Sequence, residues 1–253
     1  MLIINADDWG RSREETDVEL ACFSKGRITS VTAMMFMQDS QRAAEIAKGA
    51  RLDVGLHLNL NQSYTGAGCS PAAAQAHERI VEFMARSKHA MFVYHPILKR
   101  YFRDVYQSQS DEFHRLYGAA PSHVDGHQHR HLCANMLIDR VIPTGEKVRR
   151  NFSFWPGEKS LLNRTYRKVV DRWLARRYVL TDYFFSLGQC LRGKRLDRVT
   201  ELARTANVEL MTHPIDSEEY AWLMSDRFSD AMQGVRLEPY AGLQSKRAPA
   251  RAA

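Results

Sequence analysis

The sequence predicts an α/β fold with a mostly parallel sheet, for which a (β/α) barrel is the leading architecture. Three observations support this. Short apolar runs rich in β-branched residues alternate with segments of helical periodicity along most of the chain. Polar residues capable of chemistry end several of the apolar runs, where a barrel carries its active site. The 253 residues, of which 44% are hydrophobic, show no interdomain linker and could form one large core.

The individual elements follow from periodicity and turn residues. The expected strands are residues 2–5, 28–36, 54–60, 122–126, 147–152, 179–185 and 208–212. The expected helices are residues 14–25, 41–48, 73–87, 98–116, 132–140, 161–178 and 197–205. Seven or so strand–helix units suit a single barrel domain over residues 1–243. The polar, Ala/Arg-rich residues 244–253 are expected to be a disordered tail.

Composition excludes several classes of protein. No apolar run reaches the ~18 residues of a membrane span, and no signal peptide is expected. Four separated cysteines form no CxxC pair, so we expect free thiols in a reducing cytoplasm. The net charge of +7 is not accompanied by a zinc finger, an RNP pattern or a helix-turn-helix, and no nucleic-acid partner is expected.

Much of the positive charge lies in the helix expected at residues 161–178. Apolar and basic residues alternate there at helical spacing, as in an amphipathic basic helix. The favoured interpretation is a barrel helix with a solvated outer face. Peripheral contact with an anionic membrane surface, or contact with an acidic or lipid-linked substrate, stays open. Formation of a homo-oligomer also stays open.

Two adjacent carboxylates, Asp7 and Asp8, follow the first apolar run. Neighbouring side chains on a strand point to opposite faces, so both reach one site only if the strand ends and the chain turns. Trp9 and Gly10 are the expected turn. The pair could place one carboxylate on a metal ion and leave the other to move protons. The alternative is that one of them caps a helix beginning near Ser12.

Histidines fall at the ends of three further strands. His57 shares a strand face with Asn59, and a polar row facing a barrel interior needs a metal ion or a hydrogen-bonding partner. The alternative for His57 is a core histidine bonded to backbone. His213 ends an apolar strand just before Pro214, where it could protonate a leaving group near neutral pH. The alternative for His213 is a surface position.

The densest cluster is residues 123–131, which read HVDGHQHRH. Because the chain turns at Gly126, only one or two of the four imidazoles can point at a single site. Asp125 is expected to fix the tautomer of a histidine that binds metal. The alternative is an exposed histidine-rich loop.

One carboxylate and two imidazoles from three strand ends would form an open metal site with three protein ligands. Nitrogen and oxygen ligands suit zinc, and they also admit magnesium or another first-row divalent ion. One divalent ion is therefore expected, with zinc favoured.

Four segments give the chain a resemblance to a known family. They are residues 5–10 (NADDWG), 55–60 (GLHLNL), 123–129 (HVDGHQH) and 209–214 (ELMTHP). In this order they resemble the YdjC-type carbohydrate deacetylases, the ChbG/HpnK group, from residue 2 to about residue 243. The resemblance implies a distorted (β/α) barrel of the glycoside hydrolase/deacetylase type. It also implies a divalent metal ion and hydrolysis of the N-acetyl group of an amino sugar, with release of acetate.

The family motifs carry over to individual residues. The resemblance implies that Asp8, His57 and His127 bind the metal. It implies that Asp7 is the general base and that His213 is the general acid.

Other positions match the family less well. His129 belongs to the motif without an assigned role, and either Arg149 or Arg150 lies where related deacetylases place a site arginine. Residues 61–66 depart from the family pattern, which leaves the sugar open because loops at a barrel mouth select the substrate. A chitooligosaccharide, a free amino sugar, a lipid-linked glycan and an aminoglycoside-like metabolite all remain candidates.

Three rival functions stay open. A glycosidase using Asp7 and Asp8 would need carboxyl groups about 5 to 10 Å apart, which adjacent residues hardly provide. A metal-dependent phosphoesterase would normally need a second metal or more carboxylates. A non-catalytic protein that binds membrane or nucleic acid would be built around the basic helix.

Overall fold

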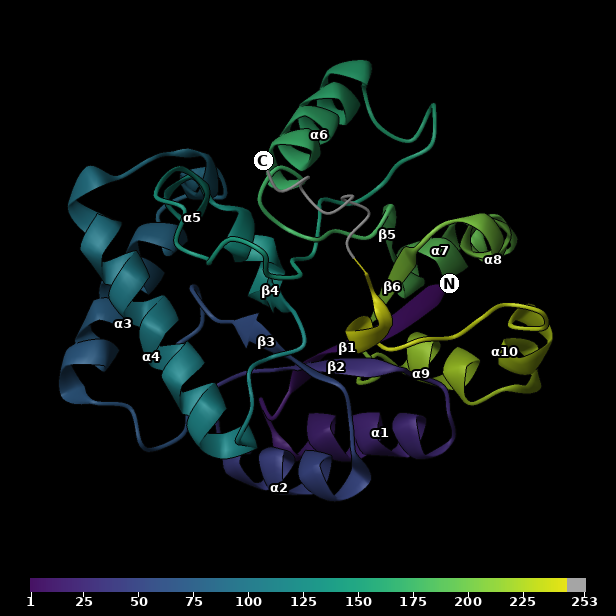
Figure 1. The fold of residues 1–253 in the computed structure, drawn as a ribbon, viewed down its shortest axis with the longest axis horizontal. Coiled ribbons are helices and arrows are strands. Elements are labelled where there is room, and N and C mark those ends of the chain that lie inside the picture. The colour runs from purple at the N-terminus through teal and green to yellow at the C-terminus, as the bar shows by residue number, and fades with distance from the viewer. Residues whose placement is uncertain (245–253) are drawn as a thin grey trace, which may run out of the picture.

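A parallel sheet of six strands in the order β4-β3-β2-β1-β6-β5 is the centre of the fold (Figure 1). The strands are β1 (Leu2–Trp9), β2 (Ser30–Ala33), β3 (Val54–Leu58), β4 (Val124–Gly126), β5 (Tyr183–Ser186) and β6 (Val208–Thr212). All five neighbouring pairs are parallel. The structure is a computed structural model and describes residues 1–244.

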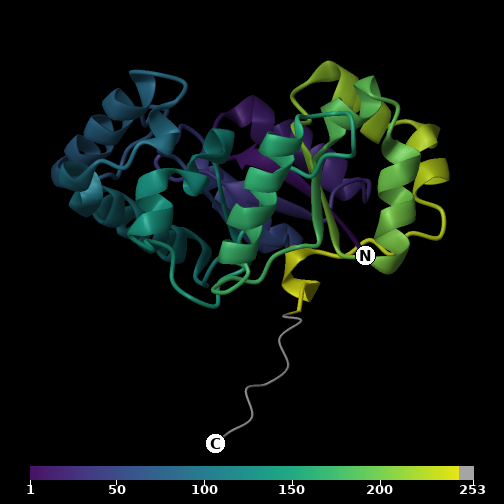
Figure 2. The ribbon, with the colours of Figure 1, turned by 90° about the horizontal axis from the view of Figure 1, so that it is seen from above.

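Helices cover the outer face of the curled sheet. They are α1 (Arg13–Ser24), α2 (Ser40–Ala50), α3 (Pro71–Ala85), α4 (Lys99–Tyr117), α5 (Ala134–Ile138), α6 (Leu161–Leu174), α7 (Leu187–Arg192), α8 (Leu196–Thr205), α9 (Ser217–Leu223) and α10 (Asp226–Ala231). Short 3₁₀ turns are η1 (Ala90–Phe92), η2 (Pro96–Leu98), η3 (His127–Leu132) and η4 (Tyr240–Gly242). In Figure 1, α1 and α2 lie below the sheet, while α6 stands at the top. Figure 2, seen from above, shows α3 and α4 at one end of the molecule and α8 and α10 at the other.

Alternation along β1 decides what faces the inside of the curled sheet. Leu2 and Ile4 pack in the main core beneath the helices. Ile3 points the other way, into a small apolar cluster with Tyr240 and Leu243. The segment around η4 therefore closes the amino-terminal end of the interior, and polar side chains take the carboxyl-terminal end.

The distorted (β/α) barrel is confirmed, but the strand predicted at residues 147–152 is wrong. Among the described residues this segment makes only isolated bridges, from Val148 to Val124 and from Lys147 to Val179. Regular pairing stops there because the next side chain, Arg149, turns into buried ion pairs. The sheet consequently has six strands and stays open between β4 and β5.

Element boundaries differ from the predictions mainly where strands end. β1 runs to Trp9 because the two carboxylates are part of the strand, and β5 begins only at Tyr183. α7, α9 and α10 were not predicted, since helices of six or seven residues give little periodic signal. The predicted tail lies, apart from Gln244, outside the described residues. None of the helices in residues 1–244 has the length and hydropathy needed to cross a membrane.

Candidate functional site

The turn that brings both carboxylates to one site lies inside β1. Asp8 has a left-handed φ of 79°, and the pairing of β1 with β2 shifts register between Ala6 and Trp9. This β-bulge re-aims one side chain, so neighbours on the strand no longer point to opposite faces. Asp7 and Asp8 are both 3% exposed. The turn predicted at Trp9 and Gly10 is confirmed, because the N–H of Arg11 donates to the carbonyl oxygen of Asp8 at 2.9 Å and Gly10 has a φ of 83°. The bulge at Asp8, which directly precedes this turn, was not predicted.

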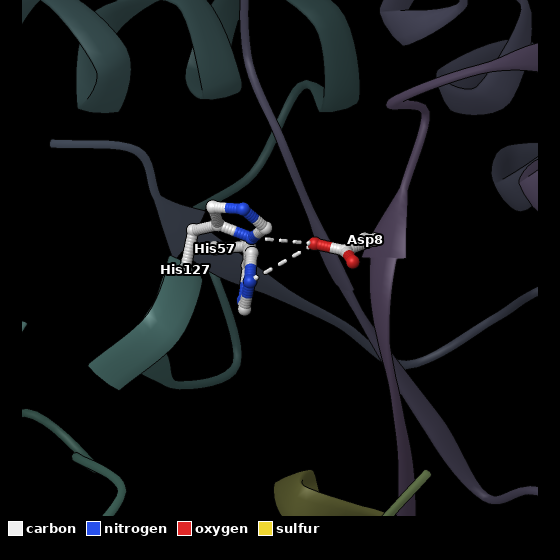
Figure 3. A group of neighbouring side chains, drawn as sticks. All are labelled: Asp8, His57 and His127. Atoms are coloured by element: carbon white, nitrogen blue, oxygen red, sulfur yellow. Dashed lines mark hydrogen bonds and ion pairs between the residues drawn. The ribbon is translucent and has the colours of Figure 1, made fainter. Parts of the chain in front are cut away.

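Three side chains from three strand ends converge on one point (Figure 3). Asp8 Oδ1 lies 3.3 Å from His57 Nε2 and 2.9 Å from His127 Nδ1. One ligand atom from each residue lies within 4.8 Å of the other two, and all three residues are buried. Ligands about 2.0–2.1 Å from a tetrahedral zinc ion are about 3.3 Å apart, so this donor set fits a divalent metal.

Asp125 on β4 orients His57, as the sequence predicts. Its Oδ1 lies 2.7 Å from His57 Nδ1, which leaves Nε2 directed toward Asp8. Burial opposes a charge on the imidazole, but Asp125 outweighs it and raises the pKa of His57 to about 10. Burial also acts against ionised Asp8, yet hydrogen bonds with His127 and His57 hold the pKa of this carboxyl well below its usual range. Metal binding to His57 would therefore release a proton.

A fully buried arginine, Arg149, forms ion pairs with three carboxylates of the site. Its guanidinium holds Asp7 in two contacts of 2.6 and 2.7 Å. It also lies 2.6 Å from Asp125 and 2.6 Å from Glu209. Burial disfavours the cation, but these three carboxylates hold the pKa of Arg149 well above its usual range. Arg150, the other candidate, pairs instead with Asp171 of α6.

Glu209 and Tyr240 extend this network and were missed by the sequence analysis. The Tyr240 hydroxyl donates to Glu209, and its ring stacks on His123 with centroids 3.6 Å apart. His123 lies against Gly55, where any Cβ would collide with the imidazole. Burial raises the pKa of Glu209 to about 7. The signal in the sequence was a charged residue inside the apolar strand β6.

The remaining histidines of residues 123–131 do not join the triad. His131 bonds through Nε2 to the carbonyl oxygen of Arg149 at 3.0 Å. Gln128 and His129 both have left-handed backbones, with φ of 51° and 57°. Burial lowers the pKa of His129 well below its usual value, so this ring is neutral. The alternative of an exposed histidine-rich loop is wrong, because both His127 and His131 are buried.

His213 lies at the same edge but makes no contact with the triad. Ala6 pairs with Thr212 in the β1–β6 register, so His213 follows at the level of Asp7. Its backbone N–H donates to Glu219 Oε2 at 2.8 Å, and Thr212 donates to the same oxygen. Within residues 1–244, its ring forms no hydrogen bond or ion pair with the other predicted site residues.

Neither Asp7 nor Asp8 caps α1, so that alternative is wrong. Ser12 is the N-cap and accepts a hydrogen bond from the N–H of Glu15. Another acid of the helix, Glu19, is buried behind the two carboxylates. Burial, together with nearby Asp8, raises the pKa of Glu19 well above its usual value.

The arrangement gives the two adjacent carboxylates different partners. Asp8 belongs to a triad of metal-ligand type, whereas Asp7 is held by Arg149. A glycosidase would need both as a free acid–base pair across one sugar, and here they have separate partners. The geometry instead suits hydrolysis in which a metal and a fixed base act together.

Comparisons with known proteins agree with this chemistry. A model of the YdjC-like protein family matches residues 1–249. A carbohydrate deacetylase of Mus musculus is 29% identical over 247 residues, which cover 84% of this chain and 77% of the mouse protein. A chitooligosaccharide deacetylase of Proteus mirabilis is 29% identical over 228 residues, covering 85% of this chain and 81% of the relative.

A solved structure supports the fold. A protein of Enterococcus faecalis, suggested to act in cellobiose-phosphate cleavage, superposes with a TM-score of 0.65 at 19% identity. The match covers 96% of this chain and 98% of that protein. At this identity the likeness concerns the arrangement of strands and helices alone.

Replacing Arg149 by methionine should be strongly destabilising. The change leaves three buried carboxylates without their cation, and loss of one partner in a buried ion cluster costs about 3–5 kcal/mol. Chemical unfolding followed by circular dichroism measures the loss. The matched control is Arg100→Met, because Arg100 is 88% exposed and pairs only with Asp104; it should stay within about 0.5 kcal/mol of wild type. Equal stability of the two variants would contradict the central role of Arg149.

Replacing Glu19 by glutamine should make stability less sensitive to pH. The pKa of Glu19 is raised in the folded state above its usual value of 4.5. Below pH 4.5 the carboxyl is protonated in both the folded and the unfolded state, so its burial does not lower the free energy of unfolding. As pH rises, Glu19 loses its proton first in the unfolded state. The free energy of unfolding of wild type therefore decreases relative to that of the variant, by at most about 1.4 kcal/mol per pH unit. Unfolding at pH 5 and pH 8 tests this, with exposed Glu14→Gln as control. A constant difference between wild type and Glu19→Gln would refute it.

Proposed function

Because the chain belongs to the YdjC-like protein family, we propose that it is a metal-dependent carbohydrate deacetylase. It removes the N-acetyl group of an amino sugar, or of a glycan or glycolipid that contains one, and releases acetate. The observation that carries the proposal is the convergence of Asp8, His57 and His127 beside a separately held carboxylate, Asp7. The names of the mouse and Proteus relatives support the same reaction.

Asp8, His57 and His127 would hold one divalent metal ion, with zinc favoured and magnesium or another first-row ion as alternatives. A bound ion of this kind polarises a carbonyl oxygen and, for zinc, lowers the pKa of water toward ~7. Asp125 supports the assignment because it directs the His57 lone pair at Nε2 toward the site. Burial of the triad keeps bulk water away from the reacting acetyl group.

Asp7 is the proposed general base. Arg149 donates hydrogen bonds to both carboxylate oxygens of Asp7, and Asn5 donates to Oδ1 at 2.9 Å. These contacts fix the orientation of the carboxylate. A fixed carboxylate can take the proton of the attacking water without reorganisation. Asp7 is a catalytic residue in this proposal, and Arg149 is the positioning residue.

His213 is the proposed general acid. An amine leaves poorly unless it is protonated, and a histidine can supply that proton near neutral pH. Glu219 anchors the end of β6 by accepting from the backbone N–H of His213. The imidazole would then reach the sugar nitrogen from the side of β1 opposite to His57, because β6 and β2–β3 flank β1 on different sides.

The proposed substrate is an N-acetylated sugar. The proposed location of the enzyme is a reducing compartment such as the cytoplasm. The relatives' names support the first part. Four free cysteines, three of them buried, support the second.

Chelation should abolish acetate release, and added zinc should restore it. The assay screens N-acetylated monosaccharides and chitooligosaccharides for acetate, with and without chelator. His57→Ala should lose both bound metal and activity because one of three ligands is gone. His114→Ala, on the exposed face of α4, is the control and should keep both. Sugar cleavage that resists chelator in a metal-free protein would instead favour a glycosidase.

Variants at Asp7 and His213 should separate the base from the acid. Asp7→Asn should keep its metal but lose about 10²–10⁴-fold in turnover on both N-acetylglucosamine and 4-nitrophenyl acetate, because both need an activated water. His213→Ala should lose turnover on the amide and largely retain it on the ester, whose leaving group needs no proton. Metal analysis and steady-state kinetics measure the two effects. Unchanged turnover by Asp7→Asn, or equal losses of His213→Ala on both substrates, would overturn the assigned roles.

A further inference from the structure

Part of the apolar stripe of α6 faces outward. Leu162, Tyr166 and Val169 are 81%, 47% and 58% exposed, whereas Asp171 and Leu174 on the opposite face are buried. A helix that covers a barrel normally turns its apolar stripe toward the core. Val170, Trp173 and Leu174 do pack against the main core, as expected of a barrel helix, but the outer face of α6 is partly apolar instead of polar. In Figure 1 this helix lies on the side of the sheet opposite to α1 and α2.

Positive charge flanks the exposed stripe. Residues 161–178 contain six arginines and lysines and one acid, Asp171, which Arg150 engages at 2.7 Å. Lys168 and Arg172 lie on the exposed side of the helix. Neither forms an ion pair with a carboxylate in the part of the chain that the structure describes. Exposed apolar side chains beside uncompensated cations are the signature of a helix that lies in an anionic lipid interface.

A cavity of about 690 Å³ extends from this face to the segment that directly follows His127. Phe92 of η1 and Tyr166 form its outer rim, with ring centroids 6.3 Å apart. Gln128 and His129, which follow the triad residue His127, form part of its inner wall. His129 Nδ1 is buried with no hydrogen-bond partner among the described residues. A molecule in the cavity would therefore have an apolar end at α6 and a polar end at the site.

The chemistry of the face favours lipid over other occupants. A sugar would find aromatic rings and hydrogen-bonding groups inside the cavity, at Phe152, Gln128 and Asn151. On the outer face, aliphatic Leu162 and Val169 offer neither and suit hydrocarbon. A second copy of this chain would bring Lys168 and Arg172 against like charges, in a protein whose net charge is already +7. Anionic lipid supplies both the hydrocarbon and the negative charge.

We propose that the outer face of α6 binds an anionic lipid surface, and that the cavity receives the hydrocarbon part of an N-acetylated sugar anchored there. The substrate class rests on the proposed deacetylase function, whereas the binding of lipid does not. The enzyme thus meets its substrate at a membrane surface, with the acetyl group directed at the triad.

Binding to vesicles tests the surface independently of catalysis. The full chain should sediment with phosphatidylglycerol/phosphatidylcholine vesicles and not with phosphatidylcholine alone. Lys168→Glu/Arg172→Glu should weaken binding by about 10-fold or more, since each cation near an anionic surface contributes substantially. Leu161→Ser/Val169→Ser should weaken it several-fold without changing charge. Lys25→Glu/Lys48→Glu is the matched control, because it makes the same charge change on the α1–α2 side of the molecule.

Several results would overturn the lipid surface. They are no binding of wild type to phosphatidylglycerol vesicles, an equal loss in the control variant, or a concentration-dependent dimer that Leu161→Ser/Val169→Ser dissociates. The last result, seen by light scattering, would assign the face to a second copy. All these substitutions are at exposed positions, and thermal unfolding verifies that each variant is folded.

Acetate release tests the substrate class. Dodecyl N-acetylglucosaminide in phosphatidylglycerol vesicles should be turned over at least 10-fold faster than soluble methyl N-acetylglucosaminide. Lys168→Glu/Arg172→Glu should abolish this advantage and keep the methyl-glycoside rate. Equal rates on the two glycosides would overturn the lipid-linked substrate and leave the deacetylase intact. No acetate from either glycoside, with vesicle binding preserved, would overturn the proposed function and leave the surface intact.

Discussion

The site depends on one buried cation. The guanidinium of Arg149 contacts Asp7 on β1, Asp125 on β4 and Glu209 on β6, so it joins three strands of the curled sheet. Three carboxylates buried together would repel one another and take up protons without it. With it, Asp125 stays ionised to orient His57, and Asp7 stays fixed. The catalytic arrangement is therefore also an element of the fold.

A second constraint is the backbone of β1. A regular strand would send Asp7 and Asp8 to opposite faces, one into the interior and the other under the helices. The left-handed conformation of Asp8 costs conformational energy for a residue with a side chain. It is compensated by the contacts of Asp8 with His57 and His127. Two neighbouring residues of the same type can therefore perform different tasks at one site.

The interior of the site and its outer rim differ in how their charged side chains are paired. Inside, Arg149 pairs with Asp7, Asp125 and Glu209, and Tyr240 closes this network at the bottom by donating to Glu209. At the rim, α6 exposes Leu162 and Val169, and within residues 1–244 neither Lys168 nor Arg172 forms an ion pair with a carboxylate. A surface that lacks its complement in the protein itself is typical of a binding surface. In the proposed mechanism the reacting groups are fixed within the chain, and the proposed lipid-binding face of α6 selects the substrate.

The sequence by itself determined the alternation of strands and helices and the polar strand ends, because period-two patterns and strand-end residues are local signals. The resemblance to the YdjC-type family then selected Asp8, His57 and His127 for the triad and left Asp7 as the separate carboxylate. The sequence failed where distant segments meet. Only the tertiary structure showed that Arg149, and not Arg150, lies in the site and that Glu209 and Tyr240 belong to its network. It also showed that the strand predicted from Lys147 forms only isolated bridges among the described residues. The outward stripe of α6 was equally hidden, since periodicity gives a helix an apolar side but not the direction in which that side points.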